Sequence, residues 1–218
     1  MVRNLKDIDL FTFDWSGTVS DDRQPVFHAN VALWEFYGLP KIKFEEWVTT
    51  HELTVDDWMA KRLPGLNTVG GRERVREQYR LNFNAVTQAG ILPQAYPDAF
   101  ATLAYLAHSG KRIAILSSHP QGNLEHEAER YNLTPYLNRI DGDCRDKNLG
   151  IRAILKSTGV NPLRTAYFGD TTHDIKAAKS AEVMSVGLTT GYHTRDQLTK
   201  ARPDLLLDRL SEIRRHLE

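Results

Sequence analysis

Side chains that bind metal ions, hold anions or act as nucleophiles come after four short apolar segments of the chain, some directly and others a few residues later. In chain order they are Asp14 in the segment DWSGT, Ser117 with Ser118, Lys147, and Asp170 with Asp174. Ligands of parallel α/β sheets bind at the carboxyl ends of the strands. If the four apolar segments are strands of one such sheet, these side chains converge at a single edge.

The residue types in this set suit phosphoryl transfer. Asp14, Asp170 and Asp174 supply the hard oxygen ligands that Mg²⁺ prefers, and a metal ion together with Lys147 would neutralise a phosphoryl group. A carboxylate can also act as the nucleophile and form an aspartyl-phosphate. Ser117 and the backbone N–H groups near residues 16 and 17 would then hold the phosphoryl oxygens. The pattern therefore predicts a Mg²⁺-dependent site for a phosphorylated ligand.

The elements that must position these residues form an alternating pattern. Residues 8–13 (IDLFTF) are predicted to be a strand, and from Tyr96 onward strand-like runs alternate with helical segments. In the helix that begins near Pro97 and Asp98, the spacing places Phe100, Leu103 and Leu106 on the inward face. Such alternation favours an α/β fold, a Rossmann-like parallel sheet with helices on both faces.

The stretch between the first and second strands is predicted to be an all-helical insert. It spans residues 21–92, so the α/β core would comprise residues 1–20 and 93–218. Three of the four tryptophans, Trp34, Trp47 and Trp58, fall in the insert, and we expect them to form the core of a small helical bundle. The insert would act as a cap that closes over the site, excludes water and selects the substrate.

The composition argues against nucleic-acid and membrane partners. Lys+Arg and Asp+Glu both number 28, so there is no basic excess of the kind that nucleic-acid binding requires. No apolar run approaches the roughly 20 residues of a membrane span, and the start of the chain has no signal-peptide pattern. Cys144 is the only cysteine. We therefore expect a cytoplasmic protein without nucleic-acid or membrane partners, as a monomer or a homodimer.

The segments that carry these residues resemble the four ordered motifs of the haloacid dehalogenase superfamily. They are FTFDWSGTVSD, LSSHP, DKNLG and FGDTTHDIKAAKSAEVMSVGL. The resemblance covers nearly the whole chain, and the long gap between the first and second motifs fits the helical C1-type cap of that superfamily. It implies a HAD-like fold and a hydrolase of small phosphorylated metabolites, similar to phosphoglycolate phosphatases.

The resemblance also implies roles for individual residues. Asp14 would be the nucleophile, and its carboxylate, the carboxylate of Asp170 and the backbone carbonyl of Ser16 would hold Mg²⁺. Asp174 would bind the metal directly or through water. Thr18 would support the Asp14 loop. Ser117 and Ser118 would bind the phosphoryl group, and Lys147 would pair with Asp14.

One position departs from the pattern. Superfamily phosphatases usually carry a second Asp two residues after the nucleophile, and this chain has Ser16 there. A serine hydroxyl cannot replace a carboxylic acid as proton donor, and general acid–base catalysis contributes about 10²–10⁴-fold. A phosphatase of this sequence would need a proton carrier from elsewhere, such as His28 or His51 in the insert.

The departure leaves other functions open. The Asp-Trp-small-Gly-Thr segment is similar to that of phosphonoacetaldehyde hydrolase, which cleaves a carbon–phosphorus bond with a cap lysine, but the nearest cap lysine here, Lys61, is six residues from the expected position. Dehalogenases also lack the second Asp, although they usually carry Tyr. A weakly catalytic or non-catalytic phospho-ligand-binding protein is a third alternative to a phosphatase. Lys61 and Arg62 are predicted to contact the substrate anion.

Overall fold

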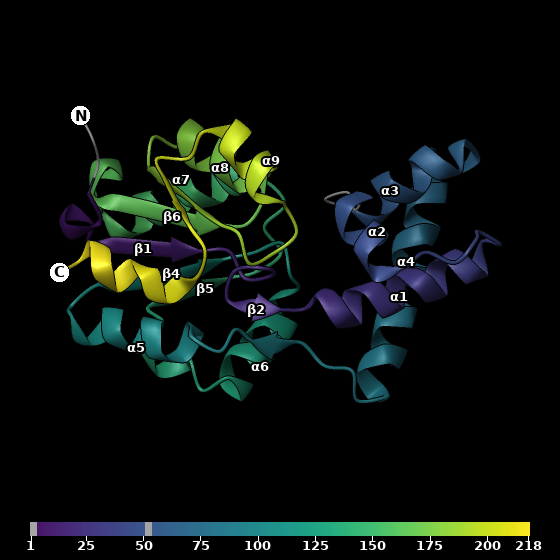
Figure 1. Ribbon diagram of the computed structural model, residues 1–218, viewed down its shortest axis with the longest axis horizontal. Coiled ribbons are helices and arrows are strands. Elements are labelled where there is room, and N and C mark those ends of the chain that lie inside the picture. Colours follow the sequence, from purple (N-terminus) through teal and green to yellow (C-terminus); the bar gives the residue numbers. More distant parts are fainter. Residues whose placement is uncertain (1–3, 51–53) are drawn as a thin grey trace. The chain divides into compact units, whose positions relative to one another are not determined.

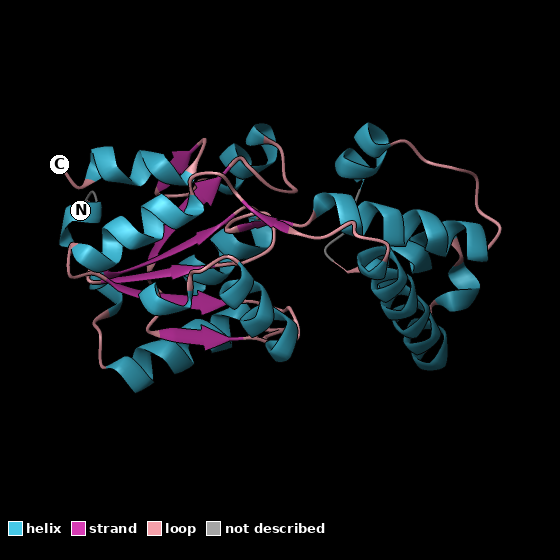
Figure 2. Ribbon diagram, turned by 90° about the horizontal axis from the view of Figure 1, so that it is seen from below, coloured by secondary structure: helices cyan, strands magenta, loops and turns pink. Residues whose placement is uncertain are grey.

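The computed structural model describes residues 4–50 and 54–218. One unit of the chain is built on a six-stranded sheet in the order β5-β4-β1-β6-β7-β8, in which every neighbouring pair is parallel (Figure 2). The strands are β1 (Leu10–Phe13), β4 (Arg112–Leu116), β5 (Arg139–Asp141), β6 (Thr165–Gly169), β7 (Met184–Leu188) and β8 (Leu205–Leu207). The predicted α/β fold with a parallel sheet is confirmed.

The first strand of the chain lies in the middle of this sheet. All four residues of β1 are buried, as expected for a short apolar strand covered on both faces. Phe13 is in register with Ile115 of β4 on one side and with Phe168 of β6 on the other. The segments that follow β1, β4 and β6 therefore leave the same edge of the sheet next to one another.

Helices cover both faces of the sheet (Figure 1). One face carries α5 (Ala99–His108), α6 (Gln121–Arg130) and the C-terminal 3₁₀ helix η5 (Leu210–His216), and the other carries α7 (Lys147–Thr158), α8 (Thr172–Ser180) and α9 (Arg195–Ala201). Side chains alternate between two clusters, so that Phe11 packs with one and Leu10 with the other. This alternation follows from the two-residue period of a strand.

The inward face of α5 differs from the prediction. Leu103 and Leu106 are fully buried as expected, but Phe100 is 45% exposed and meets Tyr136 edge to face instead. Ala99 and Thr102 complete the buried face. The helix is rotated toward its small residues because these let α5 approach the sheet, and a large side chain at position 100 then remains at the rim.

Contacts divide the chain into two compact units, Met1–Asp21 with Gln94–Glu218, and Asp22–Pro93. The second unit is helical and contains α1 (Arg23–Phe36), α2 (Phe44–Thr50), α3 (Val55–Arg62), the 3₁₀ turn η2 (Pro64–Leu66) and α4 (Val69–Gln88). Trp34, Trp47 and Trp58 are buried there, and the rings of Trp34 and Trp58 stack with centroids 4.6 Å apart. The tryptophans thus form a core, as expected.

Several short elements were not predicted from the sequence. Ser20–Asp21 (β2) and Gln94–Ala95 (β3) form an antiparallel pair, and they are too short to show an alternating pattern. The remaining short elements are the 3₁₀ turns η1 (Leu5–Asp7), η3 (Thr134–Tyr136) and η4 (Pro162–Arg164). Over residues 4–50 and 54–218, no helix combines the length and the apolar character that crossing a membrane would require.

The corrected face of α5 predicts two unequal losses of stability. Leu103→Ala should lower the free energy of unfolding by about 2–5 kcal/mol, because it leaves a cavity in the core. Phe100→Ala should cost less than about 1.5 kcal/mol, since mainly an edge-to-face contact is lost. Urea unfolding followed by circular dichroism measures both. Equal losses would mean that Phe100 points inward after all.

Candidate active site

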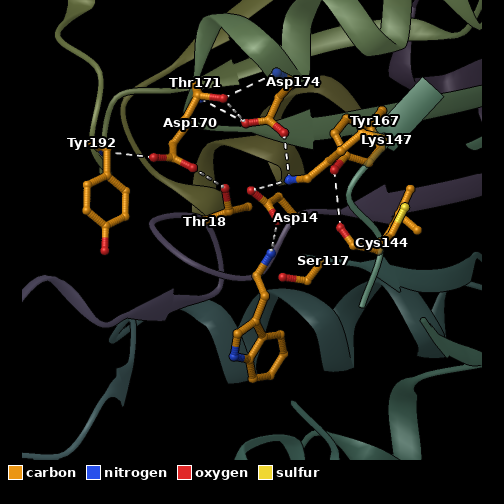
Figure 3. Close-up of polar contacts among 12 residues, drawn as sticks. Asp14, Thr18, Ser117, Cys144, Lys147, Tyr167, Asp170, Thr171, Asp174 and Tyr192 are labelled. Carbon is orange, nitrogen blue, oxygen red and sulfur yellow. Dashed lines mark hydrogen bonds and ion pairs between the residues drawn. The ribbon is translucent and has the colours of Figure 1, made fainter. Parts of the chain in front are cut away.

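The predicted residues that follow β1, β5 and β6 meet at the carboxyl edge of the sheet (Figure 3). Asp14 directly follows β1 and Asp170 directly follows β6, whereas Lys147 and Asp174 lie in the first turns of α7 and α8. All four side chains are buried. Oxygen atoms of Asp14, Asp170 and Asp174 lie within 4.8 Å of one another.

Lys147 is held between two of these carboxylates. Its Nζ lies 2.6 Å from Asp14 Oδ2 and 2.8 Å from Asp174 Oδ1, and the side chain is 8% exposed. Burial by itself would lower the pKa of Lys147, but the charges of Asp14 and Asp174 outweigh it and raise the pKa well above its usual value. Asp146 positions the lysine by capping α7 through the N–H of Leu149. Lys147 therefore remains a fixed cation.

Asp14 has both carboxylate oxygens engaged. Oδ1 accepts a hydrogen bond of 2.7 Å from the N–H of Trp15, and Oδ2 faces Lys147. Burial raises the pKa of Asp14 to about 6, against the opposing effect of Lys147. The carboxylate is thus oriented by one backbone donor and one cation, which leaves it ionised and pre-positioned near neutral pH.

Asp170 is fixed by donors on two different loops. Thr18 donates to Oδ1 at 3.2 Å and the N–H of Tyr192 donates to Oδ2 at 2.7 Å. Its pKa is raised well above the usual value, first by burial and then by the negative charges of Asp174 and Asp14. A cation bound beside Asp170 would therefore be needed to lower its pKa and favour the ionised form.

Two glycines make room for Asp170. A Cβ at Gly17 or at Gly191 would overlap the Asp170 carboxylate. Gly17 also has a φ of +75°, in the left-handed region that side chains disfavour. Thr190 ties the two glycine loops together, because its hydroxyl donates to the carbonyl of Gly17 at 2.8 Å.

Asp174 both caps a helix and pairs with the lysine of the site. It forms a capping box with Thr171 at the start of α8, in which the N–H and hydroxyl of Thr171 donate to Oδ2 at 3.0 and 2.6 Å. Its other oxygen faces Lys147. Burial opposes ionisation, but Lys147 and the Thr171 hydrogen bonds lower the pKa of Asp174. Asp174 is therefore the ionised partner of the lysine.

The three serines predicted to belong to the site differ in burial. Ser117 is 2% exposed, and its hydroxyl accepts a 3.1 Å hydrogen bond from the N–H of His119. Ser118 is exposed on the same loop, and Ser16 is half-buried, bridged through its backbone to Ser20. Figure 3 shows the Ser117 hydroxyl on the side of Asp14. The β4 loop thus adds a hydroxyl beside the carboxylates.

Three neighbours of the cluster were missed in the sequence. Thr171 and Tyr192 contact the carboxylates as described, and Tyr167 lies beneath Lys147, with the ring centroid 5.8 Å from Nζ. The Tyr167 hydroxyl donates to the carbonyl of Leu116 at 3.2 Å. Tyr167 sits inside the apolar run TAYF, so its sequence context indicates only a core position.

The insert residues predicted to contact the substrate, Lys61 and Arg62, belong to the helical unit, as does the candidate proton carrier His28. Arg62 stacks on the ring of Trp58, with Cζ 4.3 Å from the centroid, and Lys61 is exposed at the end of α3. His28 is exposed on α1, and His51 lies outside the described residues. Every residue of the carboxylate cluster belongs to the sheet unit, so the assignment of these four residues remains a prediction.

Comparisons with known proteins agree with this architecture. Residues 11–188 match the family described as haloacid dehalogenase-like hydrolase. The chain is 32% identical over 151 residues to a probable phosphatase of Dickeya dadantii, covering 65% of either chain. It is 25% identical over 217 residues to a phosphoglycolate phosphatase of Vibrio parahaemolyticus, covering 95% of either chain.

Solved structures show the same fold. A haloacid dehalogenase-like family protein of Streptococcus pneumoniae superposes with a TM-score of 0.85 at 18% identity, covering 97% of this chain and 99% of the other. A predicted phosphoglycolate phosphatase of Haemophilus somnus gives a TM-score of 0.81 at 19% identity, covering 97% and 99%. With the family match over residues 11–188, these findings show that the chain belongs to the haloacid dehalogenase-like hydrolase family.

Proposed function

We propose that this protein is a Mg²⁺-dependent phosphatase that hydrolyses small phosphorylated metabolites through an aspartyl-phosphate on Asp14. The observation that carries the proposal is the buried pairing of the Asp14 carboxylate with Lys147 beside Asp170 and Asp174. A carboxylate that is oriented, desolvated and still ionised is suited to nucleophilic attack. The phosphatase names of the relatives point to the same reaction.

The donor set fits a divalent cation. Three buried carboxylates lie together with one ammonium group, which pairs with two of them. The pKa values of Asp14 and Asp170 are raised first by burial and then by the neighbouring negative charges. Asp14, Asp170 and the Ser16 carbonyl would hold Mg²⁺, with Asp174 bound directly or through water. When bound, the ion would neutralise charge on the phosphoryl oxygens.

Side chains of the protein would supply the nucleophile and the groups that bind the phosphoryl oxygens. An oxygen of Asp14 attacks phosphorus, while Lys147 stabilises the carboxylate and the incoming phosphoryl charge. Ser117 would donate to a phosphoryl oxygen, and Thr18 keeps Asp170 in place. Ser118 is proposed as a further phosphoryl contact, because it is exposed on the same loop.

We further propose a small anionic substrate of the phosphoglycolate type. The support is the resemblance to relatives that are named phosphoglycolate phosphatases. Lys61 and Arg62, two adjacent cations at the end of α3, are the proposed contacts for the second anionic group of such a substrate.

Replacing Asp14 tests its role as the nucleophile. Asp14→Asn should reduce phosphate release from small phosphate esters at least about 10³-fold, because an amide cannot form the acyl-phosphate. The measurement is inorganic phosphate released from a panel of phosphate esters and phosphonates, with Mg²⁺ and with EDTA. The wild-type protein should be active with Mg²⁺ only.

Asp143→Asn is the matched control, since Asp143 is an exposed carboxylate on the β5–α7 loop. It should keep the wild-type rate. Substantial turnover by folded Asp14→Asn would contradict the nucleophile assignment. Release from phosphonoacetaldehyde alone would instead indicate carbon–phosphorus cleavage.

The negative charge of Asp170 affects the stability of the fold. The raised pKa of Asp170 means that ionising this group is less favourable in the folded than in the unfolded protein, so stability falls as the pH rises from the usual aspartate pKa toward the raised pKa and levels off above it. Asp170→Asn keeps an acceptor for Tyr192 and a polar group for Thr18. In EDTA at neutral pH it should raise the stability by about 0.5–2 kcal/mol, and the gain should shrink at acidic pH.

The Asp170→Asn variant also tests whether Asp170 binds the metal ion. Mg²⁺ should raise the melting temperature of the wild-type protein, because a ligand that binds the folded state stabilises it. It should have little effect on Asp170→Asn. Thermal unfolding of both proteins with EDTA and with Mg²⁺ measures this, and an equal Mg²⁺ response in the two proteins would argue against Asp170 as a ligand.

A further inference from the structure

A buried carboxylate outside the four motifs joins the two loops of the site. Glu127 on α6 is 7% exposed. Its Oε2 accepts a 2.7 Å hydrogen bond from the indole N–H of Trp15, the residue after Asp14. Its Oε1 lies 3.2 Å from Nε2 of His119, two residues after Ser117. One carboxylate thus holds a side chain from the β1 loop and one from the β4 loop.

Packing fixes this arrangement further. The Trp15 ring stacks on Tyr131 with centroids 5.6 Å apart, and the Tyr131 hydroxyl lies 2.8 Å from that of Ser20. The backbone N–H of His119 donates to Ser117. His119 is therefore linked through its backbone N–H to the serine proposed to hold the phosphoryl group, and through Glu127 to the residue next to the nucleophile.

The electrostatics make the pair suitable for proton transfer. Burial by itself would raise the pKa of Glu127, but His119, Trp15 and the nearby Arg130 outweigh it and lower the pKa. A carboxylate 3.2 Å from Nε2 of His119 favours the ring state that carries a proton on this nitrogen. Nδ1 is then the nitrogen that gains and loses a proton, and the side chain is 14% exposed, which allows exchange with solvent.

Other groups on these loops are poorly suited to carry the proton. Lys147 is a fixed cation between two carboxylates, and Asp170 and Asp174 face the proposed metal position. The hydroxyls of Ser16, Thr18 and Ser117 are too weakly acidic. A leaving alkoxide nevertheless requires a proton, and histidine titrates in the physiological range.

We propose that His119, oriented by Glu127, is the acid–base residue of this site, an inference that rests on the proposed phosphatase function. As Asp14 attacks phosphorus, the bond from phosphorus to the ester oxygen breaks and its electron pair goes to that oxygen, which takes the proton from Nδ1 of His119. Neutral His119 then accepts a proton from water as the water oxygen attacks phosphorus. The Asp14–phosphorus bond breaks, its electrons return to the carboxylate, and phosphate leaves.

The test compares two esters that differ in their need for a proton. An alkyl phosphate releases an alkoxide that must be protonated, whereas p-nitrophenyl phosphate releases a stable nitrophenolate. His119→Gln should lower kcat/KM by about 10²–10⁴-fold on the best alkyl phosphate and by less than about 10-fold on the aryl ester. It should also show a burst of nitrophenolate equal to the enzyme concentration, because hydrolysis of the aspartyl-phosphate has lost its base.

Two further variants keep the result interpretable. Glu127→Gln should show the same split between the esters with a smaller loss, since the imidazole remains but is less well oriented. His126→Gln, an exposed histidine on the same helix, should leave both rates unchanged. Circular dichroism confirms that each variant is folded, and His119→Asn replaces His119→Gln if the latter does not fold.

The outcomes separate this inference from the function on which it rests. Equal losses on the two esters without a burst, or full alkyl-ester activity in folded His119→Gln, would overturn the role of His119 and leave the phosphatase proposal intact. A wild-type protein that hydrolyses neither ester with Mg²⁺ would overturn the proposed function and this inference together.

Discussion

The site depends on a single buried interaction, in which the ammonium group of Lys147 bridges Asp14 and Asp174. Two carboxylates this close together in the interior would repel each other strongly without a cation between them. The lysine is in turn positioned by the start of α7, and Asp174 by its capping box with Thr171. The starts of two helices and the end of the central strand are thus held in register by charge as well as by packing.

The sheet order makes this interaction possible. Because β1 lies between β4 and β6, the segment after it is flanked by the two segments that carry Ser117 and Asp170. Gly17 and Gly191 then allow the backbone of two loops to approach the Asp170 carboxylate more closely than any side chain would permit. The concentration of negative charge opposes folding, and the surrounding apolar clusters must outweigh it. A carboxylate cluster that destabilises its own fold is typical of a binding centre for a cation.

On the opposite face of the sheet, Glu127 is a second buried charged group that binds partners from two loops. It is ionised and buried, and its two oxygens meet partners from the β1 and β4 loops. The Asp14 loop is therefore held from one side by Lys147 and from the other by Glu127, through the indole N–H of Trp15. Constraint from both sides limits the positions that the nucleophile can adopt, which is how a folded protein lowers the entropic cost of a reaction.

The sequence by itself determined the class of fold and the residues of the carboxylate cluster. Alternating strands and helices predict the parallel sheet, and hard ligands after successive strands predict convergence at one edge, because both depend on local patterns along the chain. The tertiary structure decided the rest. The outward position of Phe100, the β2–β3 pair, the place of Tyr167 beneath Lys147 and the link from Glu127 to His119 arise between residues distant in sequence. Glu127 lies in the ordinary-looking helix segment QGNLEHEAER, where a glutamate is usually exposed. Only the packing of α6 against the sheet buries it beside Trp15, since burial and pairing depend on neighbours that local patterns do not encode.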